Sequence, residues 1–320
     1  MRKLVGTSVI LLAGCNAHQS TLAPFGEEAR STYWLTVTLG IGALLIAVLV
    51  GTLAWRAAHS PGNALDHRQG MRLILWLGAV FPTVVLTALL LFALPEMRPL
   101  PSQPGDLTIR VDGEQFWWRV QYESGRGEPL IGANEVRIPV GRPVVFQLAA
   151  KDVIHSFWIP GLAGKMDMIP GRTNRLIVKA EKTGRFRGVC AEFCGLSHAL
   201  MAFDVVAMEP SAFDAWLVAA RTPAAVARGR TRGAALFADY GCNACHAVRG
   251  TEHDARIGPD LSRYGARTSL GAGTLPPTTG NTATFIRDAD AVKPGARMPS
   301  YPMMPEDEAH AIAAWLKELK

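Results

Sequence analysis

The segment from Cys190 to Met201, which reads CAEFCGLSHALM, brings two thiols, one imidazole and one thioether into a short stretch of chain. Soft sulfur ligands and imidazole suit copper, whereas zinc in proteins is bound by Cys, His and carboxylate side chains. A mononuclear blue-copper site uses a single Cys, so the second thiol indicates two thiolates that bridge a pair of copper ions. The segment therefore predicts a binuclear copper site.

Each copper ion of such a pair needs one imidazole. His198 lies inside the segment, and His155, at the end of an apolar stretch in the sequence KDVIHSFW, is the best candidate for the second. We expect Met201 and a backbone carbonyl, that of Glu192, to fill the remaining ligand positions. A disulfide between the two cysteines is the alternative that this spacing allows, but it leaves the imidazole and the thioether without a role.

A second motif lies towards the C-terminus, where the sequence CNACH contains Cys242, Cys245 and His246. This is the spacing at which two thioether bonds attach a c-type haem and the adjacent His binds the iron. A redox Cys pair or half of a zinc site is the alternative, but no second pair is left to complete a zinc site. The sixth ligand of the iron has three candidates, which are Met298, Met303 and Met304.

The apolar residues, 49% of the 320-residue chain, are unevenly spread, which indicates membrane spans rather than one large core. Residues 33–55 and 73–94 contain no charged side chain. Each run would be roughly 33 Å long as a helix, enough to cross a hydrocarbon layer of about 30 Å. The arginines of the loop between them, residues 56–72, place that loop in the cytoplasm, and Pro82 is expected to kink the second span.

The N-terminus has the pattern of an export signal. Two basic residues precede a short apolar run, which is followed by LAGC, a sequence similar to a bacterial lipobox. Residues 1–14 are therefore expected to be a lipoprotein signal peptide, with Cys15 as the lipid-bearing first residue of the mature chain. An ordinary signal peptide or an uncleaved start is the alternative. The net charge of +6 comes without a block of Lys and Arg, so nucleic acid is not an expected partner.

The N-terminal segment and the two spans together make up a predicted part over residues 15–100. The segments that follow it are rich in Val, Ile and aromatic residues. They predict an antiparallel β-sandwich of the cupredoxin type over residues 104–210, with the metal ligands in loops at one end. The expected strands are 107–111, 115–122, 135–138, 143–148, 175–179 and 185–189. A short helix and linker over 211–227 would lead to an all-α domain over 228–320.

Two helices, 231–240 and 306–320, are expected in this last domain. Gly233 and Phe237 of the first should pack against Trp315 of the second. His253 and His310 are expected to be surface residues rather than ligands.

The copper motif, Cys-x-Glu-x-Cys-x-x-x-His-x-x-Met with His-Ser-Phe-Trp upstream, resembles the binuclear copper (CuA) site of subunit II of haem–copper cytochrome c oxidases. With the haem motif added, the whole chain resembles the caa3-type subunit II, which has a cytochrome c domain at its C-terminus. The resemblance implies a proton-translocating oxidase in a bacterial plasma membrane, with both metal domains on the periplasmic or extracellular side. Its partners would be subunits I and III and a soluble cytochrome c or similar donor. Oxygen would be reduced in subunit I, since neither span of this chain contains a His.

The same resemblance assigns further residues. Met298, in RMPSY, matches the family's axial Met, and Pro259, in IGPDL, matches the residue whose carbonyl accepts a hydrogen bond from the axial His. Glu192 would also contact a magnesium ion at the boundary with subunit I. In QFWW, Phe116 stands where the family has a Trp through which electrons enter, so Phe116 or Trp117 would take that role.

Three questions stay open at this stage. Asp167 matches an acidic residue near the donor-docking face, but it could equally be a solvated turn residue. The chain could be a free-standing, membrane-anchored electron carrier for another terminal enzyme. It could also be a lipoprotein that delivers or stores copper, although such a protein would not need haem c.

Overall fold

The computed structural model describes residues 16–61, 65–123, 128–224 and 231–320. The predicted signal peptide and Cys15 lie outside the described residues. The chain divides into two compact units, of which one is Arg30–Pro101 and the other contains the remaining described residues.

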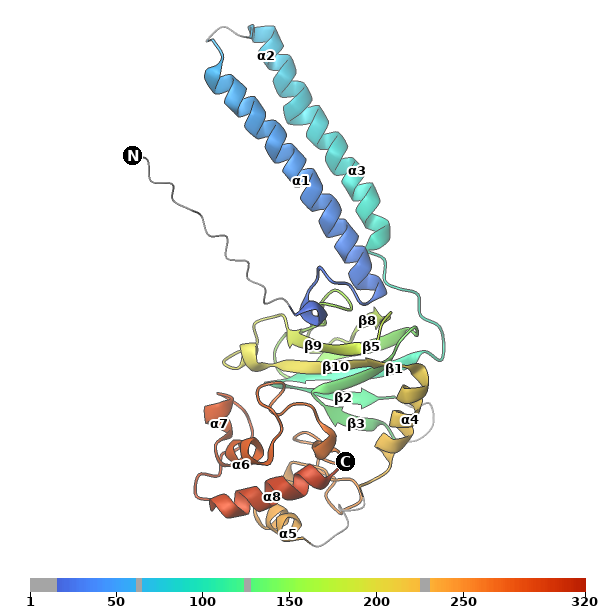
Figure 1. Cartoon of the computed structure of the whole chain (residues 1–320), viewed down its shortest axis with the longest axis vertical. Coiled ribbons are helices and arrows are strands. Elements are labelled where there is room, and N and C mark those ends of the chain that lie inside the picture. The colour runs from blue at the N-terminus through green and yellow to red at the C-terminus, as the bar shows by residue number, and fades with distance from the viewer. Residues whose placement is uncertain (1–15, 62–64, 124–127, 225–230) are drawn as a thin grey trace, which may run out of the picture. The chain divides into compact units, whose positions relative to one another are not determined.

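Two helical stretches make up most of the first unit. Helix α1 is Glu27–His59, and the second stretch joins α2 (His67–Leu73), a π-helical segment (Ile74–Val80) and α3 (Phe81–Glu96). Both are long and apolar enough to cross a membrane, each with a mean hydropathy of 2.4. They run antiparallel in Figure 1, so the predicted transmembrane hairpin is confirmed, with helices longer than the apolar runs alone.

Pro82 is accommodated by a change of helix type. A proline has no N–H and leaves a carbonyl of the preceding turn without its usual partner. The turn before it is π-helical, and the N–H of Phe81 reaches back five residues to the carbonyl of Trp76. Such π-turns are inserted into α-helices at places where the regular hydrogen-bond ladder is interrupted.

In the part of the chain that the structure describes, ten strands form a sandwich of two five-stranded sheets (Figure 1). The first sheet, in the order β3-β2-β1-β5-β8, contains β1 (Leu107–Glu114), β2 (Trp117–Tyr122), β3 (Leu130–Ala133), β5 (Val144–Ala150) and β8 (Asn174–Val178). The second, in the order β4-β10-β9-β6-β7, contains β4 (Glu135–Pro139), β6 (His155–Trp158), β7 (Met166–Met168), β9 (Gly184–Cys190) and β10 (Ala202–Met208).

The prediction of a wholly antiparallel sandwich is wrong for two strand pairs. Strand β1 runs parallel to β5, and β4 runs parallel to β10. In both cases the chain passes through other strands before it returns to the same sheet, and such crossovers allow parallel neighbours. The short strands β3, β6 and β7 and the strand β10 were not among the predicted strands.

The core between the sheets is aromatic. Side chains along β2 alternate between buried and half-buried, so Trp118 points into the sandwich. Its ring meets Phe203 at 5.0 Å, and Phe203 stacks on Phe157 at 4.5 Å between ring centres. The core thus joins β2 of one sheet to β6 and β10 of the other, directly behind the strand ends that carry the metal-binding segments.

Helix α4 (Pro210–Arg221) follows the sandwich and belongs to it. Phe213 and Ala220 are buried in the sandwich core, and Trp216 packs against Tyr122 with 5.2 Å between ring centres. The short helix expected in the linker is therefore present, but it extends the sandwich domain rather than separating the two domains.

The C-terminal domain is all-helical, as predicted. It contains α5 (Arg232–Asp239), α6 (Thr279–Arg287), α7 (Ala289–Val292) and α8 (Glu306–Glu318), with 3-10 turns at Cys242–Ala244 and Tyr264–Ala266. Helices α5 and α8 cross where Phe237 meets Trp315, 5.2 Å apart between ring centres. A Cβ on Gly233 would lie 2.7 Å from Cβ of Trp315, so only glycine allows this close crossing. The predicted packing of these three residues is confirmed.

Candidate metal centres

Two neighbouring strands position the predicted copper ligands. Strand β9 ends at Cys190 and β6 begins at His155, and the two strands pair antiparallel with Phe157 opposite Cys190. His155 is thus the first residue of a strand rather than part of a loop. The segment that follows Cys190 is closed by a hydrogen bond of 3.0 Å from the N–H of Cys190 to the carbonyl of Met201.

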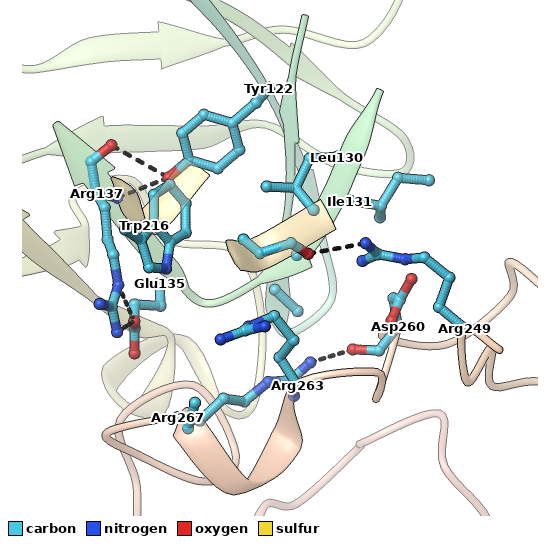
Figure 2. A pocket seen from close by; sticks show the side chains of 14 residues that line it. Tyr122, Leu130, Ile131, Glu135, Arg137, Trp216, Arg249, Asp260, Arg263 and Arg267 are labelled. Atoms are coloured by element: carbon cyan, nitrogen blue, oxygen red, sulfur yellow. Dashed lines mark hydrogen bonds and ion pairs between the residues drawn. The ribbon is translucent and has the colours of Figure 1, made fainter. Parts of the chain in front are cut away.

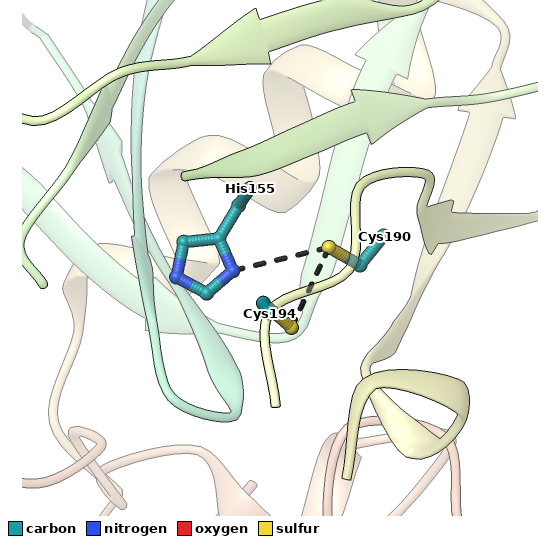
Figure 3. A group of neighbouring side chains, drawn as sticks. All are labelled: His155, Cys190 and Cys194. Atoms are coloured by element: carbon teal, nitrogen blue, oxygen red, sulfur yellow. Dashed lines mark hydrogen bonds between the residues drawn. The ribbon is translucent and has the colours of Figure 1, made fainter. Parts of the chain in front are cut away.

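The ligand atoms predicted for copper converge on the two cysteines. The sulfur atoms of Cys190 and Cys194 lie 3.8 Å apart, and Nδ1 of His155 lies 3.8 Å from the first of them (Figure 3). Cys194 Sγ is 3.6 Å from Nδ1 of His198 and 3.8 Å from Sδ of Met201.

The carbonyl oxygen of Glu192 lies 3.2 Å from the sulfur of Cys190. All six predicted copper ligands therefore meet in one place. Each cysteine has one imidazole beside it, and each has a different third neighbour, a carbonyl oxygen for one and a thioether for the other. This donor set fits a pair of copper ions.

One of the two thiols, that of Cys190, is prepared for deprotonation. The hydrogen bond between them lowers the pKa of Cys190 and raises the pKa of Cys194, so the metal-free pair holds on to one proton. A metal must displace that proton because thiolate, not thiol, is the ligand. Both cysteines, His155 and Met201 are buried, whereas the side chains of Glu192 and Phe193 are exposed at the tip of the segment.

Asp152 holds the His155 imidazole in place, a role that the sequence analysis missed. Its Oδ1 lies 2.9 Å from Nε2 of His155, which leaves Nδ1 directed at Cys190. Burial acts to raise the pKa of Asp152, but hydrogen bonds from the Gln115 N–H and from His155 outweigh it and lower the pKa. A carboxylate that orients a ligand His is a common device in metal sites. The spacing Asp-x-x-His was the available sequence signal.

The haem motif also has its expected surroundings. Cys242 and Cys245 are unpaired and half-buried, and the N–H of His246 donates to the carbonyl of Cys242 at 3.0 Å. Nδ1 of His246 lies 2.8 Å from the carbonyl oxygen of Pro259, so its Nε2 is the nitrogen left for iron. Burial lowers the pKa of His246, which favours the neutral ring, the form that binds a metal. The donor set therefore fits a haem that is attached through two thioethers.

The three candidate methionines differ in their surroundings. Met303 is 91% exposed, and Met304 is buried, with its carbonyl accepting a hydrogen bond from Nε of Arg287. Met298 is half-buried and packs against the core of the C-terminal domain. His310 is exposed beside Glu306, as predicted, whereas His253, which was predicted to be a surface residue, is half-buried beside Phe237.

The side chain of Phe116 is only 5% exposed, so a soluble protein could not dock on it directly. A Cβ on Gly195, in the copper segment, would lie 3.2 Å from its ring, and one on Gly295, in the C-terminal domain, would lie 3.3 Å from it. Phe116 thus lies between the two domains. Trp117 is half-buried under the guanidinium of Arg119, 4.7 Å away.

Asp167 accepts hydrogen bonds from Ser156 Oγ at 2.8 Å and from Lys165 Nζ at 3.0 Å. These two bonds lower its pKa. Its side chain is 45% exposed, so it is partnered locally and still accessible to solvent.

Two family models match the chain. Residues 121–208 match cytochrome c oxidase subunit II, periplasmic domain, and residues 231–320 match cytochrome c. The cytochrome c oxidase subunit 2 of Alkalihalophilus pseudofirmus is 35% identical over 97% of this chain and 94% of its own length. That of Bacillus subtilis is 30% identical over 97% of this chain and 95% of its own length.

The periplasmic domain of cytochrome oxidase subunit II from Bradyrhizobium japonicum is 35% identical and covers 37% of this chain and 96% of its own, with a TM-score of 0.33. The sequence matches extend through the membrane helices, the sandwich and the haem domain alike. The chain therefore belongs to the cytochrome c oxidase subunit 2 family, in the form that carries a fused cytochrome c domain.

Proposed function

We propose that this chain is the electron-accepting subunit of its oxidase. Electrons from a soluble cytochrome c or a similar donor would reach haem c, pass to a binuclear copper site and continue to subunit I, where oxygen is reduced. The observation that carries this proposal is the convergence of two thiols, two imidazoles, a thioether and a carbonyl oxygen within the segment and strand described above.

Copper bound there would supply reversible one-electron chemistry, and the protein would supply a fixed geometry. His155 is held by a strand and by Asp152, and both cysteines, at the end of β9 and in the segment that follows it, are buried. A rigid ligand set limits the rearrangement that accompanies a change of redox state. Cys242, Cys245 and His246 would hold haem c, and Met298 is the proposed sixth ligand of its iron.

The position of Phe116 favours transfer inside the chain. Because the C-terminal domain covers it, a soluble donor has no direct access to this part of the sandwich. We propose that electrons enter at the haem domain and that Phe116, rather than Trp117, lies between haem and copper. A tethered haem also replaces a collision between two proteins with a high effective concentration.

The exposed tip of the copper segment is the proposed contact with subunit I. Phe193 and Leu196 are 78% and 82% exposed, unusual for large apolar side chains beside a metal site. The Glu192 side chain is exposed beside them and would be free to share a magnesium ion with subunit I. We further propose that the chain lies in a bacterial plasma membrane, with both metal domains on the periplasmic or extracellular side and a lipid on Cys15. The complete oxidase would also contain subunit III and would translocate protons.

Metal analysis and electron paramagnetic resonance of the intact oxidase test this function. We expect two copper ions and one c-type haem per chain, a mixed-valence dicopper signal and copurification with a haem-bearing, many-span subunit. A protein whose Cys190 and Cys194 are joined to each other and which contains no copper would overturn the relay. Copper and haem in a chain that copurifies with no such subunit would indicate a free-standing electron carrier instead.

A further inference from the structure

The segment from Lys293 to Met298 connects α7 to the proposed axial methionine, and it lies against the copper segment. Lys293 is 3% exposed, and its Nζ donates to the carbonyl of Leu200 at 2.9 Å and to that of Gly271 at 2.6 Å. Ser197 Oγ donates to the carbonyl of Pro294 at 2.7 Å. Leu200 precedes the proposed copper ligand Met201 in the chain, and Ser197 precedes the proposed copper ligand His198. The segment from Lys293 to Met298 therefore contacts the immediate neighbours of two proposed copper ligands.

Arg297 makes the contact that reaches a ligand most directly. Its guanidinium donates to Oδ2 of Asp152 at 3.0 Å, while Oδ1 of the same carboxylate lies 2.9 Å from Nε2 of His155. Asp152 therefore uses one oxygen for each domain. Arg297 is also the chain neighbour of Met298. A single carboxylate thus joins the segment that carries the proposed iron ligand to a proposed copper ligand.

The backbone beside this ion pair approaches the copper segment. Gly295 has a left-handed conformation with φ of 75°, which favours glycine. A Cβ at this position would lie 3.3 Å from the Phe116 ring and 3.4 Å from Cδ1 of Leu196. The side chain of Arg297 is 64% exposed and that of Asp152 is 11% exposed, so the ion pair lies at the edge of this contact.

A second group of contacts joins the two domains away from the copper ligands. Arg249 and Arg263 of the haem domain donate to the carbonyls of Ala220 and Ala219, at 2.8 and 2.9 Å, at the C-terminal end of α4. Cations are favourable at that end of a helix. Figure 2 shows both guanidinium groups in the cleft beside Trp216 of α4. This group holds the haem domain on the sandwich but touches no metal ligand, so it supplies a control.

We propose that Arg297 and Asp152 are positioning residues for electron transfer between haem and copper, because their ion pair fixes the Met298 segment and the His155 imidazole in one geometry. The inference rests on the proposed function. It adds that the haem domain adjusts the copper site itself, whereas simple tethering would only keep the haem nearby.

The test uses the intact oxidase, four single variants and one double variant, in which Asp152→Asn is combined with Arg297→Met. Arg297→Met removes the cation and keeps the aliphatic stem, and Arg297→Lys restores a cation. Asp152→Asn removes the anion, and Arg263→Met is the matched control in the second contact group. A photoexcited ruthenium(II) polypyridyl complex, regenerated by a sacrificial amine, donates one electron to haem c after a flash, and transfer to copper is followed optically. The resting copper signal is recorded by electron paramagnetic resonance, and hydrogen exchange of residues 293–298 is measured in copper-free protein.

We expect Arg297→Met to slow the transfer about tenfold, the size of effect found for directly coupled residues. It should also change the copper signal and speed hydrogen exchange of the segment, and Arg297→Lys should recover most of the rate. In the Asp152→Asn background, Arg297→Met should add nothing further. Arg263→Met should leave the copper signal and the transfer rate unchanged.

A wild-type rate and copper signal in Arg297→Met would overturn the inference. An equal effect of Arg263→Met would also overturn it, because docking in general, and not this ion pair, would then set the rate. A wild-type oxidase without a dicopper signal would instead contradict the proposed function, and the hydrogen-exchange comparison would still report whether the ion pair orders the segment.

Discussion

The sulfur atoms of Cys190 and Cys194 lie 3.8 Å apart, well beyond the length of about 2.05 Å of a disulfide bond. Each sulfur faces its own imidazole, and a pair of bridging thiolates has this arrangement. Cys194→Ser removes the sulfur that lies nearest both His198 and Met201. We expect loss of the dicopper signal and a fall in electron transfer from haem to oxygen of more than about 100-fold, since even outer contacts of metal ligands contribute 10- to 100-fold.

Cys242→Ser is the reciprocal control for that variant. It removes one proposed haem thioether and no copper ligand, so copper content and the copper signal should stay as in the wild type. If Cys194→Ser retained two copper ions per chain, bridging thiolates would be the wrong description of the site.

Gly113 of β1 leaves space for the imidazole of His155, a proposed copper ligand. A Cβ there would lie 2.8 Å from Cδ2 of His155, whereas a Cβ on Gly132 of β3 would have no atom within 4 Å. Gly113→Ala should therefore destabilise the sandwich by about 1–3 kcal/mol through overpacking and alter the copper signal. Gly132→Ala should leave both unchanged or stabilise slightly. Urea unfolding and electron paramagnetic resonance of the pair check this, and equal behaviour of the two variants would contradict it.

Local sequence patterns explain why the residues of the two proposed sites could be grouped from the sequence. Most of the predicted copper donors lie in one segment after β9, and both predicted haem cysteines lie within one turn of His246, so no knowledge of the fold is needed to group them. The membrane helices and the crossing of Phe237 with Trp315 follow in the same way from long apolar runs and helical periodicity.

Contacts between distant parts of the chain could not be predicted in this way. Strand β6 contains only four residues, and its pairing with β9 depends on the whole sheet order. Lys293 and Arg297 resemble solvated cations in the sequence, yet one is buried and the other pairs with a carboxylate 145 residues away. Such roles arise from the packing of one domain on another, which no short pattern records.

The crossing of α5 and α8 depends on Gly233. A Cβ there would come within 2.7 Å of Cβ of Trp315 and would also meet the carbonyl of Ala311. Gly233→Ala should separate the helices and destabilise the haem domain by about 3 kcal/mol, the upper end for overpacking. Gly280→Ala, in α6 with no atom within 4 Å of the new Cβ, should stabilise by up to about 1 kcal/mol. Melting followed by circular dichroism compares them, and a stable Gly233→Ala variant would contradict the close crossing.

The sixth iron ligand can be identified by comparing methionines. Leucine matches methionine in volume but has no sulfur, so Met298→Leu should lower the haem potential by an amount on the order of 0.1 V, because Met/His ligation raises it. Met303→Leu should have no effect, since Met303 is 91% exposed. Met304→Leu should keep the potential and change stability by less than about 1.5 kcal/mol. Redox titration of the three variants decides among them, and a normal potential in Met298→Leu would exclude Met298.

Lys293 should make the docking of the two domains depend on pH. Burial lowers the pKa of its amine to about 7. An amine released into solvent titrates near 10.4. Between about pH 7 and pH 10 the undocked protein therefore binds more protons, and docking should become more favourable as the pH rises, by up to about 1.4 kcal/mol per pH unit. Below pH 7 both states are protonated and the dependence should vanish.

Differential scanning calorimetry of the whole chain at pH 7.5 and 9.5 measures this dependence as a change in the melting temperature of the haem domain. Lys293→Met has no proton to exchange and should lose the Lys293 part of the dependence. Lys182→Met, which removes an exposed lysine of the sandwich, should keep the wild-type dependence. If wild type and Lys293→Met respond to pH identically, then Lys293 carries the same charge in the docked and undocked states. The amine would then be held as a cation by the carbonyls of Leu200 and Gly271, which accept hydrogen bonds from it.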